Sequence, residues 1–251
     1  MGSMIHWTMK ARVSKKHAHV AFFGGSFDPP HNGHLAVARA ARDALRLDTV
    51  LFAPVGTQPL KPQGSTAAFE DRLRMTKLAI KGERGFAVSK IDAPNPAGQP
   101  NYTLETLWRL RSDLPDDASL FCLMGADSFF TLHQWHRAAE VPFAATLIVA
   151  SRPGQSLADL TSALPSGVTL EPGGAESGPG RGVKRQSFVL QNASGQRAAF
   201  HLLPGLDVEI SASEIRRQIR DQARDEAGNA AERELLPPAV ARYIRKHGLY
   251  Q

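Results

Sequence analysis

A glycine-rich junction between an apolar segment and an alanine-rich segment constrains this chain more than any other feature. Residues 24–35 read Gly-Gly-Ser-Phe-Asp-Pro-Pro-His-Asn-Gly-His-Leu, follow an apolar run at 20–23 and precede a helical pattern. We therefore expect a strand, a loop and a helix in succession. Such a junction presents backbone N–H groups and the positive end of a helix, which is an arrangement that binds nucleotide phosphates.

Short apolar runs alternate with amphipathic patterns along most of the chain. Runs at 20–23, 50–54, 120–124 and 146–150 predict buried strands, and patterns at 35–45, 69–80 and 104–110 predict helices. Further strands are expected at 188–190, 200–203 and 208–210, and helices at 213–223 and 238–246 close the chain. The alternation predicts an α/β fold with a doubly wound parallel sheet and a C-terminal helical segment.

The length of 251 residues favours one domain. We expect residues 1–17 to be a tag and a disordered lead, and residues 18–251 to form that single domain. A stretch at about 155–185 is rich in Gly, Ser and Pro and predicts a mobile surface insertion.

The chain has a net charge of +6 and a sequence pI near 9.7, which favours anionic partners. Nucleic acid is the less favoured partner, because no Lys/Arg block with interleaved aromatic residues occurs. No apolar run reaches the length of about 18–20 residues that a membrane span needs. The single cysteine, Cys122, cannot form an internal disulfide, which predicts a reducing, cytoplasmic setting.

Two segments far apart in the sequence carry groups that suit a phosphate chain. His31 and His34 are three residues apart at the start of a helix, where imidazole N–H groups can donate to phosphate oxygens. In the second segment, Ser213 is expected to be a helix N-cap that precedes Arg216. A cation in the first turn of a helix is disfavoured by the helix dipole. Its presence there would be explained if an anion binds at that helix end. The alternative to phosphate binding is that each of these residues simply packs, caps a helix or is exposed to solvent.

Other candidates lie near the ends of predicted strands. Gly125 would let a ligand approach closely, and Asp127 can accept from a ribose hydroxyl or act as an N-cap. Tyr102 and Trp135 can stack on a planar ring or simply pack. The isolated cations Lys61 and Arg152 can meet a phosphate or remain solvated.

These motifs together resemble a known family. The pattern Gly-x-Phe-Asp-Pro-x-His-x-Gly-His at 25–34 resembles the signature of the nucleotidyltransferase superfamily, and Ile-Ser-Ala-Ser-x-Ile-Arg at 210–216 resembles its C-terminal motif. The Tyr-Thr element at 102–103, Trp135, the Arg-Pro-Gly at 152–154 and the closing residues to Tyr250 resemble bacterial nicotinate-nucleotide adenylyltransferases.

The resemblance implies a Rossmann-like fold and an enzyme that transfers AMP from ATP to nicotinate mononucleotide, giving deamido-NAD and pyrophosphate. It implies Mg²⁺, which we expect to be held mainly by phosphates and water. The implied catalytic residues are His31, His34 and Arg216. The implied ATP contacts are Gly25, Ser26, Phe27, Gly125, Asp127, Ser211 and Ser213. The implied mononucleotide contacts are Lys61, Tyr102, Thr103, Trp135 and Arg152.

Alternatives are another member of the superfamily, such as a phosphopantetheine adenylyltransferase, or a non-catalytic nucleotide- or nucleic-acid-binding protein. The sequence also departs from the family pattern, which often has Ser where this chain has Asn101. No nucleic acid or membrane partner is expected, and an oligomer of identical chains is left open.

Overall fold

The computed structural model describes residues 17–61, 63–151, 157–173, 184–206, 210–222 and 235–251. The chain separates into two compact units. The first unit comprises Met1–Phe23, Ala38–Leu51 and Tyr102–Asp207, and the second comprises Gly24–Val37, Phe52–Asn101 and Val208–Gln251. The single domain expected from the sequence stays a prediction.

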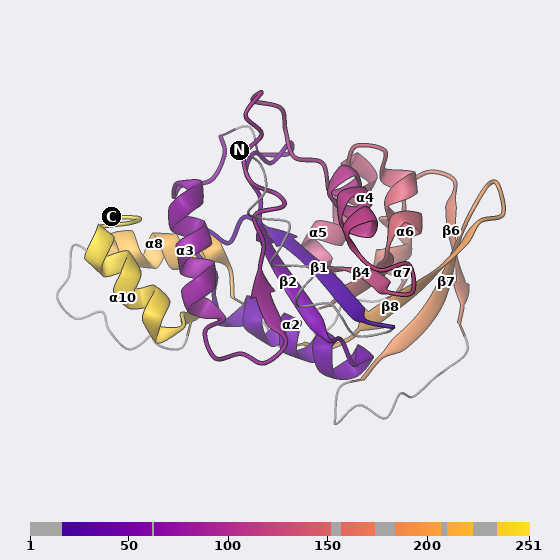
Figure 1. Ribbon diagram of the computed structural model, residues 1–251, viewed down its shortest axis with the longest axis horizontal. Coiled ribbons are helices and arrows are strands. Elements are labelled where there is room, and N and C mark those ends of the chain that lie inside the picture. The colour runs from indigo at the N-terminus through magenta and orange to yellow at the C-terminus, as the bar shows by residue number, and fades with distance from the viewer. Residues whose placement is uncertain (1–16, 62, 152–156, 174–183, 207–209, 223–234) are drawn as a thin grey trace. The chain divides into compact units, whose positions relative to one another are not determined.

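The strands form an eight-stranded sheet in the order β3-β2-β1-β4-β5-β8-β7-β6 (Figure 1). The first five positions have the order of a Rossmann-type doubly wound sheet. The strands are β1 (His19–Gly25), β2 (Thr49–Pro54), β3 (Phe86–Val88), β4 (Ser119–Gly125), β5 (Thr146–Ala150), β6 (Val168–Pro172), β7 (Gln186–Asn192) and β8 (Arg197–Leu203).

The expected direction of the strands is correct for the middle of the sheet and wrong at one edge. The pairs β1–β4, β4–β5 and β5–β8 are parallel. The pairs β7–β8 and β6–β7 are antiparallel. Only the tight turn at 193–196 joins β7 to β8, and a connection this short cannot join parallel neighbours.

Continuous apolar runs explain the burial of the central strands. Phe22, Leu123 and Ile148, from β1, β4 and β5, are each at most 2% exposed. Strands that are apolar on both faces are typical of parallel sheets covered on both sides. The strands expected at 20–23, 50–54, 120–124 and 146–150 are therefore confirmed.

The expected helices at 35–45, 69–80, 104–110 and 238–246 are also confirmed, and the one at 213–223 is confirmed as far as residue 222. The shorter helices were missed, because fewer than two turns leave little periodicity to detect. The helices are α2 (Asn32–Leu45), α3 (Phe69–Ala79), α4 (Thr103–Asp113), α5 (Ala126–Phe130), α6 (Val141–Ala144), α7 (Leu157–Ser162), α8 (Ala212–Gln222) and α10 (Pro238–His247), with 3₁₀ turns η1 (Leu132–Gln134) and η2 (Ala138–Glu140). Within the described ranges, every helix is too short or too polar to span a bilayer.

The stretch at 155–185 contains regular structure where it is described. Helix α7 and strand β6 lie in it, and β6 pairs with β7. Residues 152–156 and 174–183 lie outside the described residues, as do 207–209, which cover most of the strand expected at 208–210.

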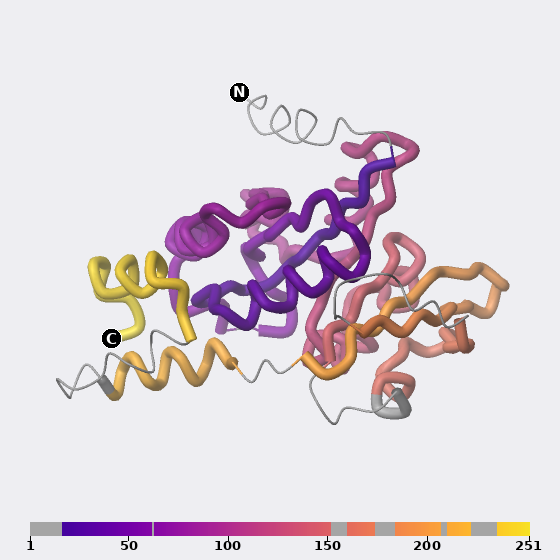
Figure 2. The backbone as a smooth tube through the Cα atoms, turned by 90° about the horizontal axis from the view of Figure 1, so that it is seen from below, coloured from indigo at the N-terminus to yellow at the C-terminus, as the bar shows by residue number. Residues whose placement is uncertain are grey.

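In the second unit, α10 packs along α3, and Figure 2 shows α10 followed by a turn at its end. Val240 and Ile244 of α10 are buried. Gly248 has a φ of 59°, and the Leu249 N–H donates to the Ile244 carbonyl over 3.1 Å. This left-handed helix end suits glycine and turns the chain back after α10.

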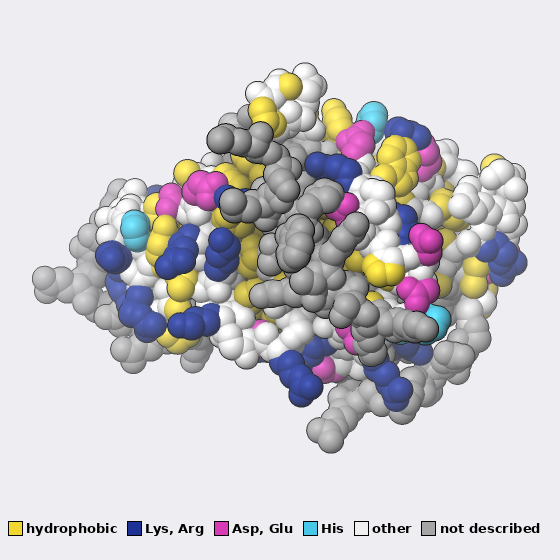
Figure 3. Space-filling model, viewed as in Figure 1, with side chains coloured by type: hydrophobic (Ala, Val, Ile, Leu, Met, Phe, Trp, Pro, Cys, Tyr) yellow, Lys and Arg dark blue, Asp and Glu magenta, His cyan; other side chains and the backbone are white. Residues whose placement is uncertain are grey.

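Exposed cations gather over α3 and α10, on the left of Figure 3. The exposed basic residues of the two helices include Arg74, Lys77, Arg242, Arg245 and Lys246. They account for part of the net positive charge and form a solvated face.

Candidate active site

The loop after β1 is folded around a buried phenylalanine. Phe27 is 1% exposed, has a φ of 47°, and packs on Phe52 with ring centroids 5.6 Å apart. Its ring also makes a T-shaped contact with the His34 ring, with centroids 4.9 Å apart. Its side chain therefore supports the histidines from the core, and its expected contact with ATP stays a prediction.

His31, at the end of the loop, and His34, in the first turn of α2, lie against each other, with ring centroids 3.7 Å apart. The backbone N–H of His31 donates to Nδ1 of His34 over 3.2 Å. Because Nδ1 of His34 accepts this bond, Nε2 carries the proton of the neutral ring and can donate to a ligand. Nδ1 of His31 is buried with no hydrogen-bond partner among the described residues.

Burial keeps both rings neutral near pH 7. It lowers the pKa of His31 to about 4. Burial, and then the neighbouring His31, lower the pKa of His34 well below its ordinary value. A neutral imidazole still offers one N–H donor, and a bound polyanion would raise both pKa values.

We expect acid to destabilise the protein because of these groups. Burial also lowers the pKa of His201 to about 4. An unfolded histidine titrates near 6.5, so between pH 6.5 and 4 the unfolded state binds more protons and the free energy of unfolding falls as pH falls. His31 alone contributes about 2 kcal/mol of this loss by pH 5.

Urea unfolding at pH 7 and pH 5 measures this effect. His31→Gln should show a smaller difference between the two pH values than the unchanged protein. Equal differences would contradict the assignment of a buried neutral His31.

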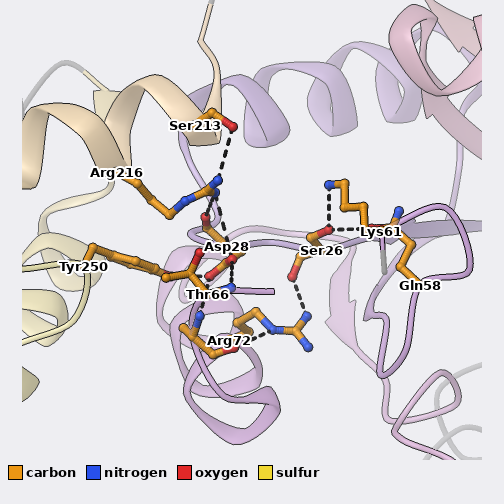
Figure 4. Close-up of polar contacts among 10 residues, drawn as sticks. Ser26, Asp28, Gln58, Lys61, Thr66, Arg72, Ser213, Arg216 and Tyr250 are labelled. Carbon is orange, nitrogen blue, oxygen red and sulfur yellow. Dashed lines mark hydrogen bonds and ion pairs between the residues drawn. The ribbon is translucent and has the colours of Figure 1, made fainter. Parts of the chain in front are cut away.

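The C-terminal motif meets the same loop (Figure 4). Nη1 of Arg216 donates to the Asp28 carbonyl over 2.7 Å, and Nη2 donates to Oγ of Ser213 over 3.2 Å. Two segments 188 positions apart thus lie in direct contact.

The expected N-cap at Ser213 is wrong, because α8 begins at Ala212 and the Ser211 carbonyl accepts from the Ile215 N–H over 3.0 Å.

The buried carboxylate of Asp28 joins several segments of the second unit. It is 3% exposed and accepts from the backbone N–H groups of Thr66 (2.6 Å) and Ala67 (3.0 Å). The Tyr250 hydroxyl donates to Oδ1 over 2.7 Å, and Nη1 of Arg216 lies 3.9 Å from Oδ2. These contacts hold the loop in place and leave the carboxylate with its oxygens occupied.

Lys61 lies beside the same loop. Its Nζ donates to Oγ of Ser26 over 3.2 Å, and Ser26 in turn donates to Oε1 of Gln58 over 3.0 Å. Burial lowers the pKa of Lys61; the charges of Arg216 and Arg72 lower it further, whereas Asp28 raises it. This concentration of positive charge favours a polyanionic ligand.

Arg72 is a supporting residue that sequence reasoning missed. It is 2% exposed, and its guanidinium donates to the carbonyls of Ser26 (2.6 Å), Val55 (2.9 Å) and Ala67 (3.2 Å). Its position in the sequence could have indicated its burial, because residues 72, 76 and 79 lie on one buried face of α3.

Asn101, a departure from the family pattern, has a clear role within the second unit. Its Oδ1 accepts from the Thr57 N–H and its Nδ2 donates to the Ala93 carbonyl, both over 2.9 Å. A serine hydroxyl is too short to make both bonds, so Asn101 fastens two loops together at the start of α4.

The first unit contains the remaining candidates. Gly125 ends β4, and a Cβ placed there would meet nothing within 4 Å, whereas Asp127 is exposed in the first turn of α5. The Tyr102 and His136 rings lie in contact, with centroids 4.3 Å apart and planes tilted by 30°, which brings the start of α4 to the segment that contains Trp135. Trp135 donates from Nε1 to Thr131 over 3.4 Å. Thr103 is the first residue of α4, and Arg152 lies outside the described residues.

Side chains that could cage a metal are absent from the described part of the chain: no cluster of three or more His, Cys, Asp or Glu residues occurs there. Asp28, the carboxylate of the loop before the histidines, already accepts three hydrogen bonds. The donor set is therefore one of N–H groups and cations, which suits phosphate rather than Mg²⁺.

Comparison with known proteins shows the family to which the chain belongs. The family model described as cytidylyltransferase-like matches residues 22–218, and the chain belongs to this class of nucleotidyltransferases. Curated relatives of Pelobacter propionicus and of Neisseria meningitidis serogroup B are both called probable nicotinate-nucleotide adenylyltransferase. The first is 35% identical over 92% of this chain and 97% of its own length, and the second is 34% identical over 92% and 98%. The chain therefore belongs to the nicotinate-nucleotide adenylyltransferase family.

Solved structures show the same fold. The nicotinic acid mononucleotide adenylyltransferase of Plasmodium falciparum complexed with NaAD has a TM-score of 0.65 and 15% identity. The same enzyme complexed with APC has a TM-score of 0.63, and each comparison covers 93% of this chain and 98% of the other. The expected Rossmann-like α/β fold is confirmed.

Proposed function

We propose that this protein transfers the adenylyl group of ATP to nicotinate mononucleotide, giving deamido-NAD and pyrophosphate in NAD biosynthesis. The observation that carries the proposal is the contact of Arg216 and Lys61 with the loop that leads into two neutral histidines, His31 and His34. The family membership of the chain supports the same reaction.

The proposed reaction is an in-line displacement. A phosphate oxygen of the mononucleotide attacks the α-phosphorus of ATP, a new P–O bond forms, and the bond to the bridging oxygen of the β-phosphate breaks. The attacking phosphate is already anionic, so no general base is required. Positioning and stabilisation of developing charge supply the rate increase.

Each candidate site residue of the second unit has a proposed role in this reaction. His31 and His34 donate N–H groups to the α-phosphate, while Arg216 and Ser213 bind the leaving pyrophosphate. The backbone of Gly25 and Ser26 contacts phosphate oxygens. Lys61, whose Nζ donates to Oγ of Ser26, contacts the mononucleotide. Ser211, just before α8, is a further ATP contact. Phe27 supports the loop and is the last residue of the proposed set of ATP contacts.

The proposed substrate contacts of the first unit are fewer. Gly125 and Asp127 would meet the adenosine, because the open space at Gly125 admits a ring or ribose. Tyr102, Thr103 and Trp135 would hold the nicotinate moiety, and Arg152 its phosphate. Mg²⁺ would enter as the complex with ATP, bound to phosphates and water. We further propose a cytoplasmic enzyme that needs neither nucleic acid nor a membrane.

Coupled turnover with a panel of acceptors tests this proposal. The purified protein is incubated with Mg²⁺, ATP and either nicotinate mononucleotide, nicotinamide mononucleotide or phosphopantetheine, and dinucleotide and pyrophosphate are quantified. We expect equal amounts of deamido-NAD and pyrophosphate with nicotinate mononucleotide. Preference for phosphopantetheine would favour the alternative transferase, and no pyrophosphate with any acceptor would favour a non-catalytic nucleotide-binding protein.

A further inference from the structure

Tyr250 contacts the active-site loop from the far end of the chain. The turn at Gly248 brings it back from α10, and its side chain is 7% exposed. Its hydroxyl donates to Oδ1 of Asp28 over 2.7 Å, 222 positions away in the sequence (Figure 4). Burial, followed by the charge of Asp28 and this hydrogen bond, raises the pKa of Tyr250, so the phenol stays a donor.

This hydrogen bond affects whether the Asp28 carboxylate pairs with the Arg216 guanidinium. Nη1 of Arg216 lies 3.9 Å from Oδ2 of Asp28 but donates instead to the Asp28 carbonyl at 2.7 Å. Among the described residues, two of the five N–H donors of the Arg216 guanidinium have partners, Asp28 and Ser213, and the remaining donors can bind a ligand. A carboxylate with fewer donors would compete with that ligand for the guanidinium.

We propose that Tyr250 is a positioning residue for the triphosphate of ATP: by occupying the Asp28 carboxylate, it keeps Arg216 available to bind phosphate. This inference rests on the proposed function. Tyr250 itself touches neither ATP nor the reacting atoms and acts through Arg216. Without the phenol, Arg216 would turn toward Asp28 and pair with it, and affinity for polyphosphate would fall while the mononucleotide site stayed unchanged.

Tyr250→Phe tests this inference, because it removes one oxygen and keeps the ring. Inorganic pyrophosphate binding is measured by titration calorimetry, and kcat and KM are measured for both substrates. We expect the Kd for pyrophosphate and the KM for ATP to rise about tenfold, which is the scale of one hydrogen bond to a charged group. The KM for nicotinate mononucleotide should stay within about twofold.

Tyr243→Phe is the matched control. Tyr243 lies on α10 in the same unit, and its hydroxyl donates to Oδ1 of Asp71 over 2.8 Å, so it too loses a tyrosine–carboxylate bond. We expect it to leave the pyrophosphate Kd within about twofold, and thermal melting of both variants compares their stability.

A double-mutant cycle with Arg216→Ala separates positioning from a general structural effect. If Tyr250 acts through Arg216, adding Tyr250→Phe to Arg216→Ala should not weaken pyrophosphate binding further. An undiminished effect in that background would overturn the inference, as would equal pyrophosphate Kd values for Tyr250→Phe and the unchanged protein. If the unchanged protein neither binds pyrophosphate nor turns over, the proposed function itself fails.

Discussion

His34→Ala is expected to lower kcat for adenylyl transfer about 10²–10³-fold, the cost of removing one donor aimed at developing negative charge. Nδ1 of His34 accepts from the His31 backbone N–H, so Nε2 carries the proton that would be donated to the α-phosphate. The KM values should change much less than kcat, because the N–H strengthens its bond as the transition state forms.

His34→Asn separates this chemistry from the structure of the loop. An asparagine side chain can still accept from the His31 N–H but has no donor at the position of Nε2. The kcat of His34→Asn should therefore be nearly as low as that of His34→Ala. His247→Ala provides the control, since His247 is an exposed histidine of the same unit that stacks on Tyr243. Circular dichroism should show all three variants folded, and near-normal turnover by His34→Asn would refute the role assigned to Nε2.

The arrangement of strands and helices was readable from the sequence wherever one kind of periodicity was sustained. Continuous apolar runs such as 120–124 marked buried strands, and apolar residues three or four apart marked α2 and α3. Direction at the sheet edge was not readable, because the apolar segments at 188–190 and 200–203 look the same in parallel and antiparallel pairs. Strand β3 has three residues, too few for a pattern.

The chemistry-bearing residues were recognisable from their motifs, but the residues that support them were not. Nothing local marks Tyr250 as a partner of Asp28, or Lys61 as a partner of Ser26, because each contact depends on how distant segments pack. Arg72 looked like an ordinary helix cation, since burial of a guanidinium depends on carbonyls from three other places in the chain. Motifs therefore reveal the groups that meet the substrate, and tertiary structure is needed to find what holds them.

Arg72→Met is expected to lower the free energy of unfolding by about 3–5 kcal/mol, a large part of the roughly 5–15 kcal/mol that stabilises a typical domain. Three carbonyls, those of Ser26, Val55 and Ala67, would lose their donor while their segments stay packed. Each buried acceptor left without a partner costs about 1–3 kcal/mol. Burial lowers the pKa of Arg72, so relief from burying its charge offsets part of this loss.

Arg74→Met is the matched control for this prediction, because Arg74 lies on the same helix and is exposed. Its effect should stay within about 0.5 kcal/mol. Arg72→Lys should fall between the two, since one ammonium group cannot reach three carbonyls that a planar guanidinium spans. Urea unfolding followed by circular dichroism measures all three variants. Equal midpoints for Arg72→Met and Arg74→Met would mean that the loop of Ser26 is held by its other contacts, chiefly those of Asp28, and that the three bonds of Arg72 add nothing to its stability.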